Sequence, residues 1–355
     1  MAKVLMKGNQ AIALAAVKAG LDAFFGYPIT PQNEVPEYLS KYMADEGRVF
    51  VQAESEVAAI NMVYGAAGAG ARVMTSSSSV GIALKQEGIS YIAAAELPCL
   101  ICSVMRAGPG LGGISPSQAD YFQATRGGGN GDYRLVVIAP ESIQETVDYI
   151  KEGFDIADQY RNPVMILVDG LIGQMMESVD MDKPVPKRDL PEKTWATTGT
   201  KYHEGRNIIN SLGLDPFYLE KHNWNLKAKY DLITKNETKY EMVNMENPDY
   251  VIVAYGTVAR IARSAIEALK EQGINVGMIR PITLWPFPKK AFDEIPKSAK
   301  GILVAEMSTG QMIDDVEISN KGRHRIAFYG KPGGLVPEPE EIVDAILNFD
   351  DRVVD

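Results

Sequence analysis

This sequence is poor in the residues that most often bind metals. Its 355 residues include only two cysteines, Cys99 and Cys102, and three histidines, His203, His222 and His324. An iron–sulfur cluster needs about four thiolates, so this chain alone cannot hold one. All three histidines lie beyond residue 200, and two of them fall in a polar stretch. This distribution argues against a histidine-based triad or a zinc site.

The two cysteines form a C-x-x-C pattern inside an uninterrupted apolar run, residues 97–105. Such a run is typical of a buried strand, in which residues three apart point to opposite faces. We therefore interpret Cys99 and Cys102 as small buried side chains. A redox or metal-binding pair is the alternative.

The sequence also lacks any run of eighteen uncharged apolar residues, so we expect no membrane span. The apolar stretch near the N-terminus is too short for a signal peptide, and we expect a soluble cytoplasmic protein. The net charge of -10 disfavours a broad surface for nucleic acid or anionic membranes. We expect neither as a partner.

The composition, 46% hydrophobic and 23% charged, is that of a globular protein with room for two domains. Segments typical of helices and strands alternate from residue 8 to about residue 170. This alternation predicts an α/β fold with a doubly wound parallel sheet covered by helices on both faces. The expected strands are residues 23–26, 48–52, 71–75, 97–105, 135–139 and 164–168; the expected helices are residues 9–19, a segment after Pro31, and residues 54–69 and 79–95.

The composition changes after about residue 180. Residues 181–248 are rich in charged and amide side chains and predict a polar connector, extended at first, with a helix within residues 215–243. A second α/β unit begins at residues 250–256 and continues with a helix at 259–272 and strands at 275–280 and 301–306. We therefore expect a first domain at residues 1–180, a connector at 181–248 and a second domain at 249–355.

Residues 27–31 read Tyr-Pro-Ile-Thr-Pro. Thr30 followed by Pro31 is a common way to open a helix, with threonine as the N-cap and proline as the first helical residue. A strand-to-helix turn at the carboxyl end of a parallel sheet is also where ligands bind. Capping and ligand contact are compatible, and both stay open.

Glu54 and Glu56 stand at the start of the helix predicted for residues 54–69. Acidic residues in a first turn interact favourably with the helix dipole, which is the simplest explanation. The small residues at 57–70, however, would permit close packing at a subunit interface. A carboxyl group held in such an interface could bind a ring nitrogen of a ligand.

Two further turns could bind an anion. Residues 75–81, Thr-Ser-Ser-Ser-Ser-Val-Gly, join a strand to a helix, so the hydroxyl of Ser78 and the helix amides could hold an anion; a plain serine cap is equally consistent. Arg106 ends the apolar strand and precedes a loop of small residues at 107–113. This position suits bidentate capture of a carboxylate, and a solvent-facing arginine is the alternative.

Together these segments resemble the α subunit of 2-oxoacid:ferredoxin oxidoreductases over essentially the full length of the chain. The resemblance implies that residues 1–180 form the pyrimidine-binding domain of a thiamine diphosphate enzyme. It implies that residues 249–355 form a domain like the C-terminal domain of transketolase. The matching segments are residues 27–31, Ser55 and Glu56 with the helix behind them, and residues 105–112, 131–133 and 280–288.

The resemblance also implies roles for individual residues. Glu56 would hydrogen-bond the pyrimidine nitrogen of thiamine diphosphate, and Tyr27, Pro28 and Ser78 would contact the cofactor. Thr30 and Arg106 would hold the carboxylate of a 2-oxoacid. The cofactor would supply the carbanion that attacks the 2-oxo carbon.

Partners follow from the same resemblance. It implies a β subunit with the diphosphate and Mg²⁺ site, a γ subunit and a ferredoxin-like δ subunit, with [4Fe-4S] clusters on the partner subunits. Coenzyme A would accept the acyl group and ferredoxin the electrons. The likeness favours a branched-chain substrate such as 3-methyl-2-oxobutanoate. The alternatives are 2-oxoglutarate and a non-catalytic scaffold or anion-binding protein of the same fold.

The glycine-rich loop at residues 127–132 departs from the family pattern. Tyr133 stands where the Gly-Asp-Gly element of a diphosphate site would need glycine, so we predict no metal or diphosphate site there. Asn130 stands where many relatives have histidine. Asparagine cannot titrate near pH 7, so the loop lacks the proton-transfer group that a histidine would supply.

Overall fold

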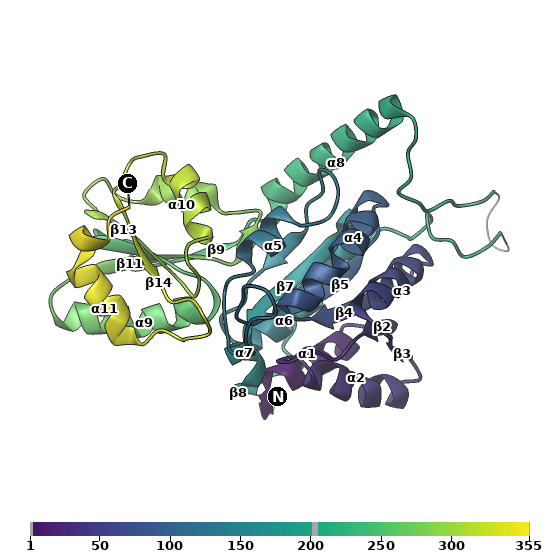
Figure 1. Cartoon of the computed structure of the whole chain (residues 1–355), viewed down its shortest axis with the longest axis horizontal. Coiled ribbons are helices and arrows are strands. Elements are labelled where there is room, and N and C mark those ends of the chain that lie inside the picture. Colours follow the sequence, from purple (N-terminus) through teal and green to yellow (C-terminus); the bar gives the residue numbers. More distant parts are fainter. Residues whose placement is uncertain (1–2, 201–204, 355) are drawn as a thin grey trace.

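The computed structural model describes residues 3–200 and 205–354, and it contains two main sheets that lie side by side (Figure 1). The larger sheet has the strand order β12-β6-β7-β5-β4-β2-β3, and every pairing except β12 with β6 is parallel. The predicted parallel sheet of the N-terminal part is thereby confirmed. Its strands are β2 (Ala23–Gly26), β3 (Val49–Gln52), β4 (Val73–Ser77), β5 (Cys99–Met105), β6 (Val136–Ile138), β7 (Pro163–Asp169) and β12 (Thr283–Trp285).

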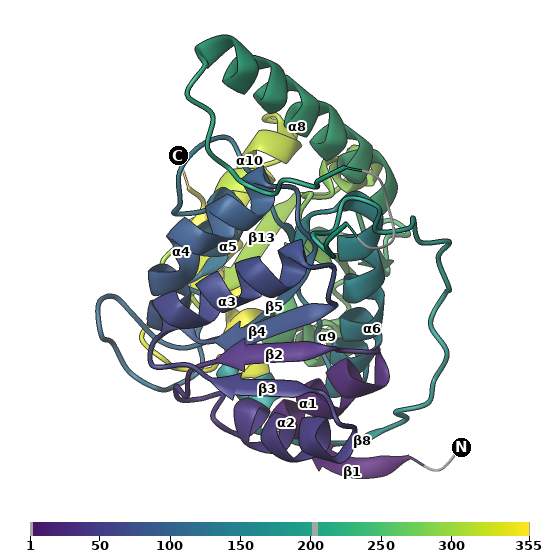
Figure 2. The ribbon, with the colours of Figure 1, turned by 90° about the vertical axis from the view of Figure 1, so that its right-hand side faces the viewer.

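Helices cover both faces of this sheet, as the alternating pattern predicts. Helices α3 and α4 pack on one face and α1, α2 and α6 on the other, so that each face belongs to a separate apolar cluster (Figure 2). The helices of this part are α1 (Gly8–Lys18), α2 (Glu34–Asp45), α3 (Glu56–Gly68), α4 (Ser79–Ala94), α5 (Tyr121–Arg126), α6 (Ile143–Tyr160) and α7 (Gly170–Gln174).

The central strand β5 is buried along its whole length. Cys99 faces the cluster under α3 and α4, and Cys102 faces the opposite cluster. Burial raises the pKa of both thiols to about 12. The interpretation of the two cysteines as buried side chains is confirmed, and because they point to opposite faces they do not form a redox or metal-binding pair.

The smaller sheet has the order β14-β13-β10-β11-β9, with only β9 antiparallel. Helices α9 and α11 cover one face, and α10 packs on the other. The elements are β9 (Tyr240–Val243), β10 (Tyr250–Val253), α9 (Gly256–Glu271), β11 (Val276–Pro281), β13 (Gly301–Glu306), α10 (Met312–Asn320), β14 (Ile326–Gly330) and α11 (Pro339–Leu347), with short 3-10 turns at Lys289–Glu294 and Phe349–Arg352.

Helix α8 (Pro216–Glu237) is the helix predicted in the connector. Its N-cap Asp215 accepts a hydrogen bond from the backbone N–H of Phe217, and Pro216 begins the helix. The C-terminal half buries Tyr230 and Ile233, whereas the N-terminal end projects from the body (Figure 1). None of the helices in the described part of the chain is long and apolar enough to span a membrane. His203 lies outside the described residues.

The two parts are joined more closely than the connector suggests. Strand β12, from the C-terminal part, completes the edge of the larger sheet, while β1 (Val4–Lys7) and β8 (Met176–Val179) form a small antiparallel pair. Arg280 of β11 is 3% exposed in its side chain and donates two hydrogen bonds to Glu145 of α6, at 2.8 and 2.9 Å, and one to Glu241 of β9, at 2.8 Å. This ion network therefore spans both sheets.

We expect the change Arg280→Ala to destabilise the protein by about 2 to 3 kcal/mol, because it leaves three partly buried carboxylates close together without their buried cation. Urea unfolding measures this loss. Arg325→Ala removes an exposed pair with Asp350 and should cost less than about 1 kcal/mol. Equal effects of the two changes would contradict the role given to the network.

Candidate active site at the carboxyl edge of the larger sheet

Four strand ends form a row at one edge of the larger sheet. Strands β5, β4, β2 and β3 are parallel neighbours in that order. Arg106 follows β5, Ser78 follows β4, residues 27–31 follow β2, and Glu56 opens α3 after β3. Strand β3 is added on one side of β2 and β4 on the other, so the order of strands in the sheet reverses there. Such switch points are where open α/β sheets bind ligands. The predicted site residues therefore share one edge.

Glu56 is the first residue of α3, behind the N-cap Ser55, whose hydroxyl accepts a hydrogen bond from the backbone N–H of Ala58. Glu56 is 6% exposed. A Cβ atom added to Gly81 of α4 would lie 2.8 Å from Oε1 of Glu56, so the carboxyl group lies directly against that glycine. Glu54, by contrast, precedes the helix and is exposed.

Unpaired hydroxyl groups lie at the start of α4. The Oγ atoms of Ser77 and Ser78 are buried and have no hydrogen-bond partner in the described part of the chain. Ser78 is the N-cap residue of α4, but its side chain makes no capping bond, so the plain serine cap is wrong. A Cβ atom on Gly81 would overlap Oγ of Ser77. The Glu56 carboxyl group and the free Ser77 hydroxyl beside one glycine, with the free Ser78 hydroxyl at the same helix start, suit a ligand with ring nitrogens.

Arg106 is also buried, at 7% exposure, so the solvent-facing alternative is wrong. Its Nη1 and Nη2 atoms donate to the carbonyl oxygens of Thr30 and Leu111, each at 3.1 Å. No carboxylate in the described ranges forms a salt bridge with it. Asp120 is the acidic group whose charge interacts with Arg106.

Asp120 is 8% exposed, and its Oδ2 accepts a hydrogen bond of 2.6 Å from Ser79. Burial raises the pKa of Asp120 to about 6, although the Ser79 bond and the Arg106 charge act against that rise. The carboxyl group therefore changes charge within the range in which most enzymes work. No feature of the sequence pattern singled it out.

A cavity of about 770 Å³ lies between the two parts of the chain and includes Arg106. This volume is in the range of small-molecule sites. Gln118 joins the two parts of the chain beside this cavity. Its side chain donates a hydrogen bond to the carbonyl oxygen of Tyr255 and accepts one from the N–H of Met307. The lining residues include Ser79, Asp120 and Gln123 from the first part and Ser308, Gln311 and Gly333 from the second.

The remaining predicted residues border this region. Tyr27 and Pro28 are exposed next to the row of strand ends. Thr30 does not cap α2, which begins at Glu34; its hydroxyl accepts a hydrogen bond from Asn33 instead. The capping interpretation is therefore wrong. The carbonyl group of Thr30 fixes the Arg106 guanidinium.

The glycine-rich loop is anchored to α4 through Tyr133. Its hydroxyl accepts bonds from the N–H groups of Gly128 and Gly129 and donates to the side chain of Gln86. Asn130 is exposed and is not among the residues that line the Arg106 cavity. Among the described residues no cluster of three or more His, Cys, Asp or Glu side chains is arranged for a metal ion.

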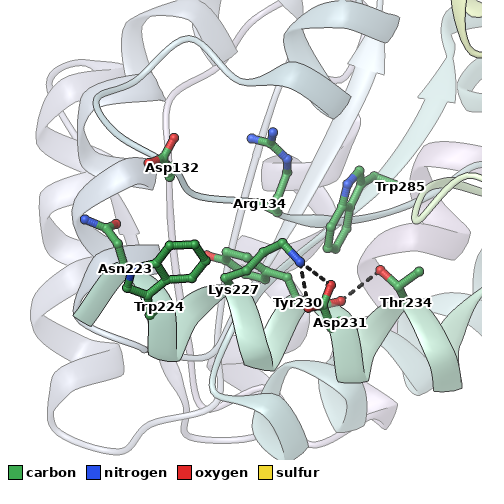
Figure 3. Close-up of a pocket in the computed structure, with 9 residues that line it drawn as sticks. All are labelled: Asp132, Arg134, Asn223, Trp224, Lys227, Tyr230, Asp231, Thr234 and Trp285. Carbon is green, nitrogen blue, oxygen red and sulfur yellow. Dashed lines mark hydrogen bonds and ion pairs between the residues drawn. The ribbon is translucent and has the colours of Figure 1, made fainter. Parts of the chain in front are cut away.

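A second pocket, of about 470 Å³, lies between α8 and the end of this loop at Asp132 and Arg134 (Figure 3). Lys227 and Asp231 of α8 pair with each other at 2.6 Å on its exposed rim. Trp285 closes one end of the pocket, beside Arg134. The pocket shares no residue with the Arg106 cavity.

Comparisons with known proteins agree with this geometry. Residues 14–247 match the family model described as pyruvate flavodoxin/ferredoxin oxidoreductase, thiamine diP-binding, and residues 248–342 match pyruvate:ferredoxin oxidoreductase core domain II. The ketoisovalerate oxidoreductase subunit VorB of Methanothermobacter thermautotrophicus is 46% identical over 98% of this chain and 97% of its own. The chain belongs to this oxidoreductase family.

Two solved structures have a fold similar to that of this chain. A 2-oxoglutarate:ferredoxin oxidoreductase from Magnetococcus marinus has a TM-score of 0.85 at 27% identity, over 97% of this chain and 65% of that chain. This chain therefore spans less than two thirds of that protein. A split-gene transketolase shares the fold alone, with a TM-score of 0.60 at 14% identity over 96% of this chain and 97% of that chain. The predicted fold class, a doubly wound thiamine diphosphate-binding sheet with a second, transketolase-like α/β domain, is confirmed.

The contact at Gly81 gives a direct test of the site. In Gly81→Ala the new methyl group would overlap Ser77 and push Glu56 aside. We expect at least a roughly tenfold loss of affinity for thiamine diphosphate, measured by equilibrium dialysis on the co-expressed complex. Gly65→Ala, at an exposed helical position of α3 where an added Cβ meets nothing within 4 Å, controls for glycine replacement. Wild-type affinity in Gly81→Ala would contradict the site.

Proposed function

We propose that this chain is the α subunit of a thiamine diphosphate-dependent 2-oxoacid:ferredoxin oxidoreductase. The reaction is the oxidative decarboxylation of a 2-oxoacid to acyl-CoA and CO₂ with reduction of ferredoxin. The proposed substrate is branched, such as 3-methyl-2-oxobutanoate. Membership of the oxidoreductase family and the 46% identity to a ketoisovalerate oxidoreductase subunit support this proposal.

The observation that carries the proposal is the row of side chains at the switch point. Glu56, with the free hydroxyls of Ser77 and Ser78, fits the polar edge of a pyrimidine ring, and Gly81 leaves the space beside it. Tyr27 and Pro28 would border the ring from the exposed side. Bound thiamine diphosphate would supply the carbanion chemistry of the decarboxylation.

Arg106 would hold the substrate carboxylate. A buried guanidinium without a carboxylate partner is costly, and an anionic substrate would provide that partner. The backbone of Thr30 orients the guanidinium, and the Thr30 hydroxyl is proposed as a further substrate contact. The loop at 107–113 is small enough to leave the guanidinium accessible from the cavity.

The charges of the cavity favour a substrate with one carboxylate. Of its lining residues in the described ranges, Arg106 is the only cation, and Asp120 is an acidic group beside it. 2-Oxoglutarate carries a second carboxylate, which would need a second cation and would be repelled by Asp120. A branched apolar side chain has neither difficulty.

The proposal includes partners that complete the enzyme. The diphosphate and Mg²⁺ would be bound by a β subunit, and the [4Fe-4S] clusters by γ and ferredoxin-like δ subunits. The presence of only two cysteines, both buried in β5, supports clusters on other chains. We propose a cytoplasmic location for the complex.

Viologen reduction by the co-expressed complex, with coenzyme A, thiamine diphosphate and Mg²⁺, tests the function. We expect kcat/KM for 3-methyl-2-oxobutanoate to exceed that for 2-oxoglutarate by at least about tenfold, because the cavity offers one cation. Pyruvate serves as the small-substrate comparison. Preference for 2-oxoglutarate would overturn the substrate assignment but keep the reaction class.

Glu56→Gln in the same complex is the control for the chemistry. This variant should lose about a hundredfold or more in kcat, since an amide cannot exchange a proton with the ring nitrogen. An assembled complex of the variant with full activity would refute the role of Glu56. Absence of reduction by the wild-type complex with every acid would favour a scaffold or a simple anion-binding protein.

The change in charge of Asp120 with pH should make substrate affinity depend on pH. Above about pH 6 its carboxyl group is ionised and repels a substrate carboxylate at Arg106; below about pH 6 it is neutral. We expect the KM for 3-methyl-2-oxobutanoate to fall roughly threefold to tenfold as the pH is lowered through 6. Asp120→Asn keeps an acceptor for Ser79 and should show the low KM throughout. A KM with the same pH dependence in this variant would contradict the assignment.

A further inference from the structure

Lys85 of α4 is a fully buried lysine, at 0% exposure. Its Nζ atom donates a hydrogen bond of 3.0 Å to the hydroxyl of Thr75, which in turn donates to the carbonyl oxygen of Phe25. No carboxylate in the described ranges forms a salt bridge with Lys85. A buried ammonium group without a close counter-ion destabilises a fold, so its presence here calls for a functional reason.

Cations that serve the fold are placed differently. Arg280 is surrounded by Glu141, Glu145 and Glu241. Lys229, another largely buried lysine, pairs with Glu96 at 3.2 Å. Lys85 has no such partner and lies below the strand ends that form the proposed site.

The geometry of α4 directs Lys85 toward Glu56. Gly81 and Lys85 are four residues apart and so lie on one face of the helix. Helical side chains lean toward the N-terminus of their helix, which points Lys85 back toward Gly81. The Glu56 carboxyl group lies against that glycine. Burial lowers the pKa of Lys85 to about 8, and the charge of Glu56 opposes this lowering.

We propose that Lys85 is a positioning residue for Glu56: its buried ammonium group is the counter-charge behind the Glu56 carboxyl group, and it orients that group toward the ring nitrogen of the bound pyrimidine. This inference rests on the function proposed above. A cation near a carboxyl group favours a hydrogen bond in which the proton lies on the partner nitrogen. Lys85 thus acts on the hydrogen bond between Glu56 and the pyrimidine nitrogen through its charge, without touching the substrate.

The other groups around α4 do not replace Lys85 in this role. Ser77 and Ser78 are neutral, and the Tyr133 hydroxyl bonds to Gln86. Arg106 and Asp120 lie beyond Ser79, where they line the separate cavity. The charge that acts on Lys85 is that of Glu56.

The variant Lys85→Met tests the proposal in the co-expressed complex. We expect kcat to fall at least about tenfold, the acid limb of the kcat–pH profile to move to higher pH, and the affinity for thiamine diphosphate to weaken. The midpoint of thermal unfolding should stay the same or rise, because a buried charge is removed. Lys229→Met is the matched control, with wild-type kcat and cofactor affinity expected.

The pH dependence of cofactor binding gives a second readout. Lys85 is charged below about pH 8 and neutral above it, so the wild-type affinity for thiamine diphosphate should decline as the pH rises through 8. In Lys85→Met this decline should be absent. If the methionine variant does not fold, Lys85→Gln provides the same comparison with a polar side chain of similar length.

The outcomes separate the two proposals. An inactive Glu56→Gln complex together with a Lys85→Met complex of wild-type kcat, pH profile and cofactor affinity would refute the role of Lys85 and leave the function standing. A Lys85→Met complex that loses stability and activity together, with an unchanged pH profile, would also refute it and indicate a structural lysine. A fully active Glu56→Gln complex would refute the function itself.

Discussion

The close approach of α3 and α4 is the contact on which the proposed site depends. Two glycines on α4, Gly81 and Gly88, face α3, where they meet Glu56 and Ile60. A Cβ atom at Gly88 would lie 2.5 Å from the Ile60 side chain, so a larger residue at either glycine would separate the helices. Because the helices pack this tightly, the Glu56 carboxyl group of α3 and the Ser77 hydroxyl before α4 lie against the same glycine.

The buried charges of the chain divide into two kinds. Arg280 and Arg72 are enclosed by carboxylates and hold elements together: Arg280 joins the two sheets, and Arg72 binds Asp155 and Asp158 of α6. Arg106 and Lys85 are buried without such partners in the described part of the chain. Charges of the second kind cost stability, and both lie at the switch point between β2, β4 and β5. We interpret them as charges kept for ligand chemistry, one for an anionic substrate and one for Glu56.

The periodicity of the sequence was sufficient to predict the long helices and the central strands. Apolar runs such as residues 97–105 predict buried parallel strands, and parallel strands place Arg106, Ser78 and Glu56 at one edge. The helix-capping pattern gave a wrong prediction at Thr30. Thr30-Pro31 has the pattern of a helix start, but three more residues precede α2, which begins at Glu34. Short edge strands such as β12 carry too few residues to show a period.

The remaining site residues depend on contacts between distant segments. Asp120 becomes important only because the loop around Gln118 packs against Tyr255 and Met307, more than a hundred residues away. Lys85 is the single lysine in an otherwise largely apolar helix, which is a signal that the sequence offers. Its meaning, however, depends on the glycine one turn earlier and on the helix that packs there.

A structure of the assembled complex with thiamine diphosphate tests the proposed site directly. We expect the pyrimidine ring between Tyr27 and the start of α4, with its ring nitrogen within hydrogen-bond distance of Glu56 and with the Lys85 ammonium behind that carboxyl group. A pyrimidine ring bound elsewhere, or one whose ring nitrogen has no contact with Glu56, would contradict the proposed cofactor site.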